Sequence, residues 1–409
     1  MKAAFVAFLI SIFLLSVSDH PARAATFKII HDFSGGSDGK LPSWAPTLGP
    51  GGKLFGSTLG GGNSQGGVVY QLSPNNDGTW DETILHSFDF ATEGDGLARG
   101  VVLDAQANLY GTTADGGPGG SGTVFELSSS DSSLSLLYAL GGDVRLVLSE
   151  TGDIYAPLGP GDYKAGAVGE LSPDAGSWTY TALYSFCAHP PQCPDGDLPS
   201  APLIWDTSGN LYGTTLDGGV QPPTCGQPLG CGVVFQLSPT RNNTWAYHLI
   251  HSFGTIAGDG QAPAGGLVRD RFGGLYGATS YGGPNFLNGT IYKLMPSTTG
   301  RGWKESVIYT FPDCSQGCSP YDELAVDKAG NLYGVANGGN TSCFGASCGV
   351  VYRLSLQRNG SWKYSVLHKF SGSDGAAPNG VIVGTDGNLY GTAEFGGDNN
   401  LGVAFEITP

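Results

Sequence analysis

Apolar residues in this chain recur with period two in short runs, a pattern typical of β-strands. The runs Gly232 to Leu237 and Trp245 to Phe253 are clear examples. Clusters of Gly, Asp and Asn separate the runs, as expected for tight turns between strands. No run has the period of an amphipathic helix. The pattern therefore predicts an all-β protein of many short antiparallel strands.

A Leu-Tyr-Gly triplet, or a near copy of it, recurs along the chain. Its copies begin at Leu54, Leu109, Ile154, Leu211, Leu275, Leu332 and Leu389. Their spacing of about 45–64 residues is typical of the blades of a propeller. A turn with Asp and Gly precedes most copies, as in Asp206 to Asn210. In such a turn, Asp caps the backbone and Gly takes the left-handed conformation.

Two further strands follow each triplet. The third strand of a unit reads like Gly232 to Leu237 and is apolar on both faces, as expected between neighbouring sheets. The fourth begins at a Trp and ends at a Phe eight residues later, in the pairs Trp80/Phe88, Trp178/Phe186, Trp245/Phe253, Trp303/Phe311 and Trp362/Phe370. An even spacing predicts that both rings lie on one face of the strand.

The two ends of the chain complete one another. Residues Thr26 to Phe33 resemble a fourth strand that lacks the preceding three, and Gly402 to Ile407 resemble a third strand that lacks a fourth. Pairing them would close a ring and remove two exposed sheet edges. A β-solenoid or an open array would not need this match. We predict one domain, residues 25–409, that is a seven-bladed β-propeller with four antiparallel strands per blade. The expected blades are 41–88, 97–140, 143–186, 200–253, 264–311, 321–370, and 378–408 closed by 26–33.

The N-terminus predicts export. Lys2 precedes about fifteen apolar positions and the small-residue segment Ala22-Arg23-Ala24, so residues 1–24 have the form of a signal peptide. The run is shorter than the roughly 20 residues of a spanning helix, which disfavours a membrane anchor. We expect a secreted, periplasmic or cell-surface protein, without membrane insertion and monomeric.

Net charge limits the classes of binding partner, and cysteine content indicates the state of the cysteines. The formal net charge is −16, which disfavours nucleic acid as a partner and leaves cations open. An even number of cysteines in an exported chain favours disulfides over zinc, and the close spacings are not those of a zinc ribbon. The expected pairs are Cys187–Cys193, Cys225–Cys231, Cys314–Cys318 and Cys343–Cys348.

The recurring elements resemble the GloVer (Gloeo/Verruco) tandem-repeat family. Gly213-Thr214-Thr215 with Gly218-Gly219, and Leu85-His86-Ser87-Phe88, carry the resemblance. It implies a bacterial exported or surface repeat protein of the choice-of-anchor type, with no established activity or catalytic residues. The chain departs from that pattern because no C-terminal anchor is visible and its third copy, 141–186, lacks the Thr-Thr and Gly-Gly elements.

One repeat position, two residues before the Phe, holds either His or Tyr. His31, His86, His251 and His368 alternate there with Tyr138, Tyr184 and Tyr309. Both rings can pack and make one hydrogen bond, so we interpret the position as structural.

Candidate binding residues lie between the blades. An Asp-Gly element follows the fourth strand at Asp38, Asp95, Asp195, Asp259 and Asp374. On the way to the next inner strand it would approach the channel, where such carboxylates could attract Ca²⁺; a role as turn caps is the alternative. Aromatic residues in the variable loops between second and third strands could stack on sugar rings: Tyr281, Phe286 and Phe344. These loops and the Asp-Gly elements are the predicted binding face.

Enzyme motifs are largely missing. The chain has no H-E-x-x-H, phosphate loop or G-x-S-x-G, and the acids that would begin inner strands are Asp143, Asp322 and Glu323. We therefore expect a non-catalytic binding or surface protein for a carbohydrate or protein ligand, with no cofactor unless Ca²⁺ binds. A glycan-active hydrolase or lyase is the alternative.

Overall fold

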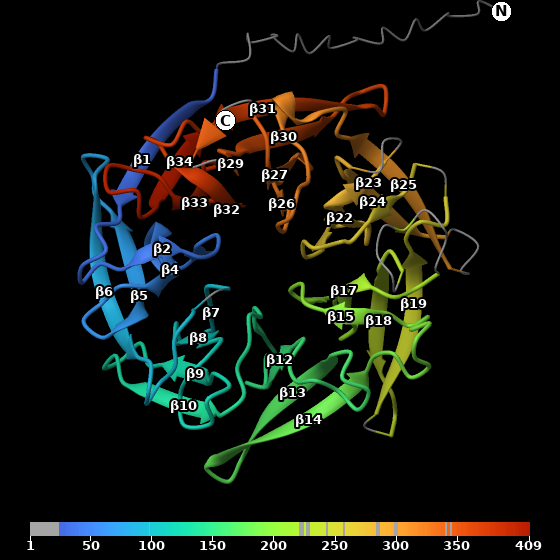
Figure 1. Ribbon diagram of the computed structural model, residues 1–409, viewed down its shortest axis with the longest axis horizontal. Coiled ribbons are helices and arrows are strands. Elements are labelled where there is room, and N and C mark those ends of the chain that lie inside the picture. Colours follow the sequence, from blue (N-terminus) through green and yellow to red (C-terminus); the bar gives the residue numbers. More distant parts are fainter. Residues whose placement is uncertain are drawn as a thin grey trace, which may run out of the picture.

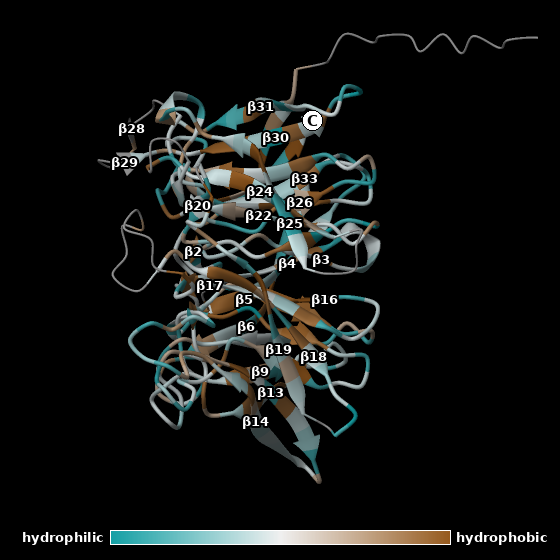
Figure 2. Cartoon of the chain, turned by 90° about the vertical axis from the view of Figure 1, so that its right-hand side faces the viewer, coloured by the Kyte–Doolittle hydropathy of each residue, from teal (hydrophilic) through white to brown (hydrophobic). Residues whose placement is uncertain are grey.

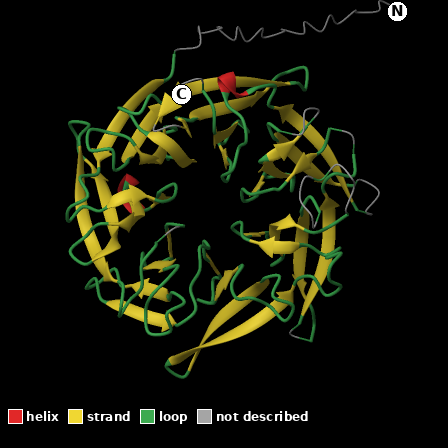
Figure 3. Cartoon of the chain, viewed as in Figure 1, coloured by secondary structure: helices red, strands yellow, loops and turns green. Residues whose placement is uncertain are grey.

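The protein is described by a computed structural model that covers residues 24–409 except 98, 221–224, 226–229, 243, 257, 284–286, 298–301, 340–341 and 344–345. The predicted signal peptide, residues 1–24, lies outside this part save for its last residue. Seven antiparallel sheets of four or five strands stand in a ring around a central axis (Figure 1), and two two-stranded sheets, in blades 5 and 6, accompany them in the described chain. The regular structure of the described residues is strand apart from two short 3-10 turns, η1 (Pro50–Gly52) and η2 (Cys314–Gln316) (Figure 3). The predicted all-β, seven-bladed propeller is confirmed.

Each blade runs from a short inner strand near the axis to an outer strand at the rim. Blade 1 contains β2 (Lys40–Pro42), β3 (Thr47–Leu48), β4 (Leu54–Gly60), β5 (Gln65–Pro74) and β6 (Trp80–Asp89). Blade 2 contains β7 (Val101–Leu103), β8 (Leu109–Thr112), β9 (Val124–Leu127) and β10 (Leu134–Tyr138). Blade 3 contains β11 (Val147–Leu148), β12 (Ile154–Ala156), β13 (Ala167–Asp174) and β14 (Ser177–Ser185). Blade 4 contains β15 (Asp197–Pro199), β16 (Ile204–Trp205), β17 (Leu211–Asp217), β18 (Val233–Pro239) and β19 (Trp245–Ser252).

The remaining three blades follow the same plan. Blade 5 contains β20 (Gly260–Gln261), β21 (Val268–Arg269), β22 (Leu275–Thr279), β23 (Tyr281–Gly282), β24 (Thr290–Pro296) and β25 (Trp303–Thr310). Blade 6 contains β26 (Ala325–Val326), β27 (Leu332–Ala336), the hairpin β28 (Ser342–Cys343) and β29 (Ala346–Ser347), β30 (Val350–Leu356) and β31 (Trp362–Lys369). Blade 7 contains β32 (Ala376–Val383), β33 (Leu389–Phe395), β34 (Val403–Thr408) and β1 (Thr26–Asp32).

The ring closes as predicted. Strand β1 pairs antiparallel with β34, with Thr26 opposite Thr408 and Asp32 opposite Val403. The sheet order of blade 7 is β1-β34-β33-β32, so the first strand of the described chain forms the rim of the last blade (Figure 1). Every blade thus has a complete set of four strands, and the third strand of blade 7 is not left as an unpaired edge.

The Leu-Tyr-Gly triplet begins the second strand of each blade, and its glycine has a packing reason. Gly213 lies opposite Phe235 across the β17–β18 pair, and a methyl group at Gly213 would lie 2.6 Å from the ring. Blade 3 differs, because Ala156 lies opposite Gly169 and the ring of Tyr180 in the outer strand covers that glycine. A small residue in the second strand thus always lies beside an aromatic ring, which the third strand supplies in blade 4 and the outer strand supplies in blade 3.

The Asp-Gly turns before the triplets also form as predicted. In blade 4, Asp206 Oδ1 accepts hydrogen bonds from the backbone N–H of Ser208 (2.8 Å) and of Asn210 (3.0 Å). Gly209 takes φ 79°, a left-handed conformation. The hydroxyl of Tyr212 donates to Asp206 Oδ2 (3.1 Å), which ties the turn to the second strand.

One prediction about the outer strands is wrong: the Trp and the Phe of an outer strand do not lie on the same face. In every blade the register shifts just before the His/Tyr position, so one apolar residue, such as Leu85 in β6, has no partner in the ladder. Such a bulge reverses the side-chain alternation beyond it. Accordingly, Trp80 packs on Tyr390 of the preceding blade (5.6 Å between ring centroids), and Phe88 packs on Phe125 of the following blade (4.8 Å).

The hydrophobic core lies between the blades rather than on the axis. One buried cluster joins Ile30, Phe33 and Tyr390 of blade 7 to Leu54 and Tyr70 of blade 1. Viewed from the side, the sheets form a thick disc, with loops on both faces (Figure 2). Each seam between neighbouring blades therefore buries apolar side chains from both of them.

Candidate functional site

Four of the five Asp-Gly aspartates lie against a His or Tyr ring of an outer strand. Their carboxylates lie beside His31 (3.8 Å from Asp38), Tyr184 (2.8 Å from Asp195), His251 (3.3 Å from Asp259) and His368 (2.9 Å from Asp374). The exception is Asp95, because His86 pairs with Glu93 instead (2.9 Å). The cavities on the axis are lined by other residues.

The predicted loop residues have different outcomes. Tyr281 lies in β23 and is 45% exposed. Phe286 and Phe344 lie outside the described residues. All four predicted disulfides, Cys187–Cys193, Cys225–Cys231, Cys314–Cys318 and Cys343–Cys348, are formed.

One end of the central channel opens into a cavity of about 330 Å³. This cavity lies on the axis, because every blade contributes at least one residue to its lining, among them Ser43, Arg99, Asp143, Ser200, Ala264, Tyr321 and Asn379. Arg99 forms a two-pronged ion pair with Asp143 (2.7 and 3.2 Å), and its guanidinium lies 4.5 Å from the centre of the Trp44 ring. This ion pair joins blades 2 and 3 at the mouth.

A second cavity of about 240 Å³ shares Trp44 and Asp322 with the first. Arg145 also lines it and donates to Thr47 of blade 1 (3.1 Å). Asp322 is 4% exposed; its Oδ1 accepts from the N–H of Glu323 (2.7 Å), and its buried Oδ2 has no hydrogen-bond partner. Structure thus brings the predicted inner-strand acids Asp143, Asp322 and Glu323 to one channel.

Burial dominates the electrostatics of these acids. It raises the pKa of Asp322 to about 7, although the Glu323 N–H and the charge of Arg99 act in the opposite direction. It also raises the pKa of Glu323, against the effect of Arg145, and the pKa of Glu394 at the mouth. A carboxyl group that titrates near neutral pH in a cavity is able to donate or accept a proton.

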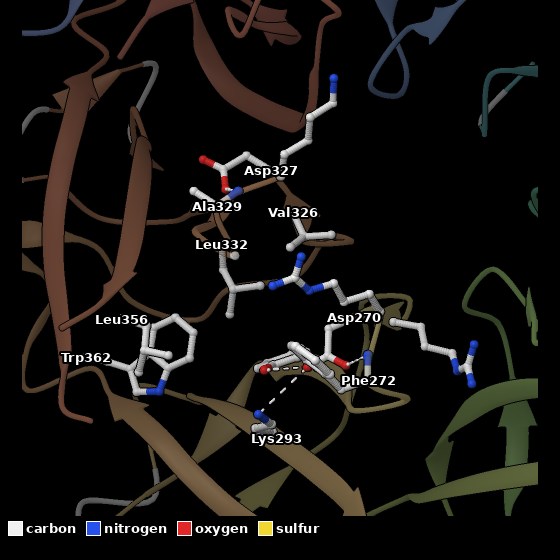
Figure 4. Close-up of a pocket in the computed structure, with 14 residues that line it drawn as sticks. Asp270, Phe272, Lys293, Val326, Asp327, Ala329, Leu332, Leu356 and Trp362 are labelled. Atoms are coloured by element: carbon white, nitrogen blue, oxygen red, sulfur yellow. Dashed lines mark hydrogen bonds and ion pairs between the residues drawn. The ribbon is translucent and has the colours of Figure 1, made fainter. Parts of the chain in front are cut away.

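A larger groove of about 690 Å³ lies between blades 5 and 6 (Figure 4). Its walls are the turn after β21, the turn after β26, and the side chains of Leu356 and Trp362. Phe272 is 72% exposed, and Arg271 lies 4.8 Å from its ring centre. Lys293 lies 4.9 Å from the ring centre of Tyr276 and 3.8 Å from Asp270.

The groove is cationic although the chain is acidic. Arg269, Arg271, Lys293 and Lys328 line it, against Asp270 and Asp327. Both aspartates are engaged within their own turns: Asp327 accepts from Ala329, Asn331 and Tyr333, and Asp270 accepts from Phe272, Gly274 and Tyr276. The groove therefore presents positive charge beside exposed aromatic and aliphatic surface.

Two of these residues depart from the repeat. Arg269 occupies an inner-strand position that is apolar in the other blades, where it is Leu48, Leu103, Leu148, Trp205, Val326 or Val383. Phe272 occupies a turn position that is otherwise Gly51, Gln106, Thr151, Ser208, Ala329 or Asp386. The sequence analysis missed both. Alignment of the seven copies, position by position, would have revealed them.

The arrangement defines the class of protein: a closed seven-bladed β-propeller with a charged axial channel and a cationic, aromatic groove between two blades. Within that class, the chain belongs to the Gloeobacter/Verrucomicrobia repeat family, which matches residues 20–147, 143–348 and 288–409. The family resemblance drawn from the motifs is thereby confirmed. No curated protein sequence matches the chain.

Several solved structures share the fold. Polysaccharide lyase Uly1 aligns over 89% of this chain and 89% of its own, with 12% identity and a TM-score of 0.51. PorZ, a bacterial surface component of the type-IX secretion system of Porphyromonas gingivalis, aligns over 89% of this chain and 46% of its own, with 13% identity and a TM-score of 0.50. A gluconolactonase of Xanthomonas campestris aligns over 94% and 89%, with 16% identity and a TM-score of 0.43. At these identities the likeness concerns the fold alone.

The disulfides indicate the cellular compartment of the protein. Four of them in one chain are typical of an oxidising environment outside the cytosol. In the part of the chain that the structure describes, no helix has the length and apolarity to cross a membrane.

Proposed function

We propose that this chain is an exported, non-catalytic, monomeric β-propeller that binds a carbohydrate in the groove between blades 5 and 6. The observation that carries the proposal is the turn Arg269 to Phe272, where an inner-strand cation and an exposed ring replace the residues of the other blades. A half-buried apolar position that becomes Arg, and a small or polar turn position that becomes an exposed Phe, serve no packing need of the repeat. Both are suited to contact with a ligand.

The charge of the groove narrows the ligand. Four cationic side chains against two aspartates, one of which pairs with Lys293, leave a net positive charge that favours a ligand with carboxylate or sulfate groups. The exposed ring of Phe272 and the half-buried ring of Trp362 offer flat apolar surfaces for sugar rings. An acidic polysaccharide supplies both features in one molecule.

Affinity electrophoresis of the full chain in gels that contain polygalacturonate, alginate or dextran tests this proposal. We expect retardation by the two acidic polymers and none by dextran. Arg269→Leu and Phe272→Ser restore residues found at these positions in other blades, so both variants should fold. Each should weaken binding about tenfold, which corresponds to the loss of one good contact.

The matched control is Ser208→Ala, at the turn position of blade 4 that corresponds to Phe272. It should bind like the wild type. Unchanged binding by the Arg269→Leu/Phe272→Ser double variant would contradict the assignment of the groove. Retention by an acidic peptide but by none of the glycans would replace the carbohydrate with a protein ligand.

Export and calcium binding are parts of the same proposal. Intact-mass measurement of chain recovered outside the cytosol should show cleavage after Ala24. The calcium expectation concerns Asp38, Asp95, Asp195, Asp259 and Asp374, which lie in different blade connections and outside the groove. Calcium titration calorimetry of the EDTA-treated chain tests it, and no calcium binding would argue that these aspartates act as turn caps.

Turnover of a glycan is a second candidate function, and Asp322 is the observation that favours it. A buried acid with a pKa of about 7, beside Glu323 in an axial cavity, has the protonation behaviour of a general acid. Release of reducing or unsaturated sugar ends from a glycan panel, lost in Asp322→Asn, Glu323→Gln or Asp143→Asn, would establish it. Absence of turnover across the panel would leave binding alone.

A further inference from the structure

The seams between consecutive blades pair two repeat positions. On one side is the His/Tyr position of an outer strand. On the other side is the residue two places after the Trp in the next blade's outer strand. Two of the seams stack tyrosines, Tyr184 on Tyr247 (4.6 Å between ring centroids) and Tyr309 on Tyr364 (4.4 Å).

Glutamate occupies the second position in two blades, and in both the residue across the seam is a histidine. The first set is His31, Asp38 and Glu82, between blades 7 and 1, and the second is His251, Asp259 and Glu305, between blades 4 and 5. The other blades carry Phe27, Leu134, Tyr180, Tyr247 and Tyr364 at that position. The Asp-Gly aspartate of the preceding connection completes each set.

The spacing within each set suits one metal ion. Potential ligand atoms of all three residues lie within 4.8 Å of one another in both sets. His251 Nε2 lies 3.3 Å from Asp259 Oδ2 and 4.0 Å from Glu305 Oε2. His31 Nε2 lies 3.3 Å from Glu82 Oε1 and 3.8 Å from Asp38 Oδ2. Ligands bound to zinc tetrahedrally at its usual bond lengths lie about 3.3–3.5 Å apart.

Burial leaves polar atoms without partners at these seams. The side chains of Asp259 and Glu305 are only 1% and 3% exposed, and Glu305 Oε1 is buried with no hydrogen-bond partner. In the other set, His31 Nε2 and Glu82 Oε1 are likewise buried and have no hydrogen-bond partner, although they lie 3.3 Å apart as an ion pair. Groups of this kind are costly unless an ion or hydrogen bond compensates them.

We propose that each of these two sets binds a divalent transition-metal ion of the zinc type, with a water molecule as the fourth ligand. One imidazole and two carboxylates are typical zinc ligands, whereas Ca²⁺ requires six to eight oxygen ligands. Asp259 Oδ1 accepts from the N–H of Gly260 (2.8 Å), and both oxygens of Asp38 accept from Ser34 (2.6 Å). These hydrogen bonds hold the carboxylates in place for the ion.

The ions would cross-link neighbouring blades at the rim. The ion between blades 7 and 1 would tie His31 of the closing strand β1 to Glu82 of β6. Since β1 is the strand that completes the ring, this ion would oppose the opening of the propeller. The ion between blades 4 and 5 would join β19 to β25 in the same way.

Metal content and titration calorimetry with ZnCl₂ test the proposal on the untagged full chain, after treatment with EDTA and dialysis. We expect two zinc ions per chain and an increase of a few degrees in Tm on addition of zinc. Glu305→Gln and Glu82→Gln should each reduce the stoichiometry to one, and the double variant should bind none. The glutamine variants keep the shape of the side chain, and circular dichroism without zinc reports their folding.

His368→Gln is the matched control, because His368 and Asp374 meet Phe27 rather than a glutamate. It should still bind two ions. No zinc binding by the wild type at micromolar concentrations, or two ions retained by the folded double variant, would overturn the proposal. If only one of the single variants loses an ion, the site in the other seam is wrong.

Discussion

Asp322→Asn replaces a buried carboxyl group of the axial channel with an uncharged amide of the same shape. The pKa of Asp322 is about 7 in the folded chain, against an ordinary value of 3.8, because burial disfavours its charge. Between these pH values the residue is protonated when folded and ionised when unfolded. Its contribution to stability is therefore fully present below about pH 4 and is lost as the pH rises through 7.

The size of the loss follows from the pKa difference. At about 1.4 kcal/mol for each tenfold difference in proton affinity, the wild type loses on the order of 4 kcal/mol, of which about 3 kcal/mol falls between pH 5 and 8. The asparagine variant lacks this loss and keeps an oxygen to accept from the Glu323 N–H. Relative to the wild type, it should become more stable by up to about 3 kcal/mol over that range.

Urea unfolding followed by tryptophan fluorescence measures this difference at pH 5 and at pH 8. Comparison of variant and wild type at each pH cancels the titration of all other groups. Glu150→Gln, at an exposed position, is the control and should show no such trend. A stability difference between Asp322→Asn and wild type that is the same at both pH values would refute the argument that burial controls Asp322.

Three further perturbations test the packing of the ring. Gly213→Ala places a methyl group 2.6 Å from the ring of Phe235 and should cost about 1–3 kcal/mol in urea unfolding; an unchanged midpoint would contradict the cross-strand packing. Phe27→Ala removes the ring that stacks on His368 at 3.8 Å and should cost about 2 kcal/mol, whereas equal stability would argue against β1 as a closing strand. Replacement of both cysteines of Cys225–Cys231 by Ala should lower stability by no more than about 2 kcal/mol, because the closed loop is short; global unfolding on this change would disprove a local role.

Features that depend on residues within one repeat could be predicted from the sequence. Strand period, the Leu-Tyr-Gly triplets, the Asp-Gly turns and the four close cysteine pairs depend on residues within one blade. Ring closure was predictable because Thr26 to Phe33 matches the strand that the last blade lacks. The fold could be predicted because the hydrophobic pattern and the repeat spacing determine the position, length and order of the strands.

Other features depend on contacts between blades. A bulge in each outer strand turned Trp80 and Phe88 toward different neighbours, although their even spacing indicated one face. Sequence reasoning placed the Asp-Gly carboxylates beside the channel, whereas four of the five lie against outer-strand rings.

The candidate sites likewise emerged from packing. Asp322 acquires its altered pKa from the blades packed around it, and the groove at Phe272 forms because two separate turns line one cavity. The linear pattern specifies strands and their order, while closure brings together side chains from units far apart in the chain. The burial and the charge of the candidate sites, and the distances between their side chains, are therefore set by contacts between blades.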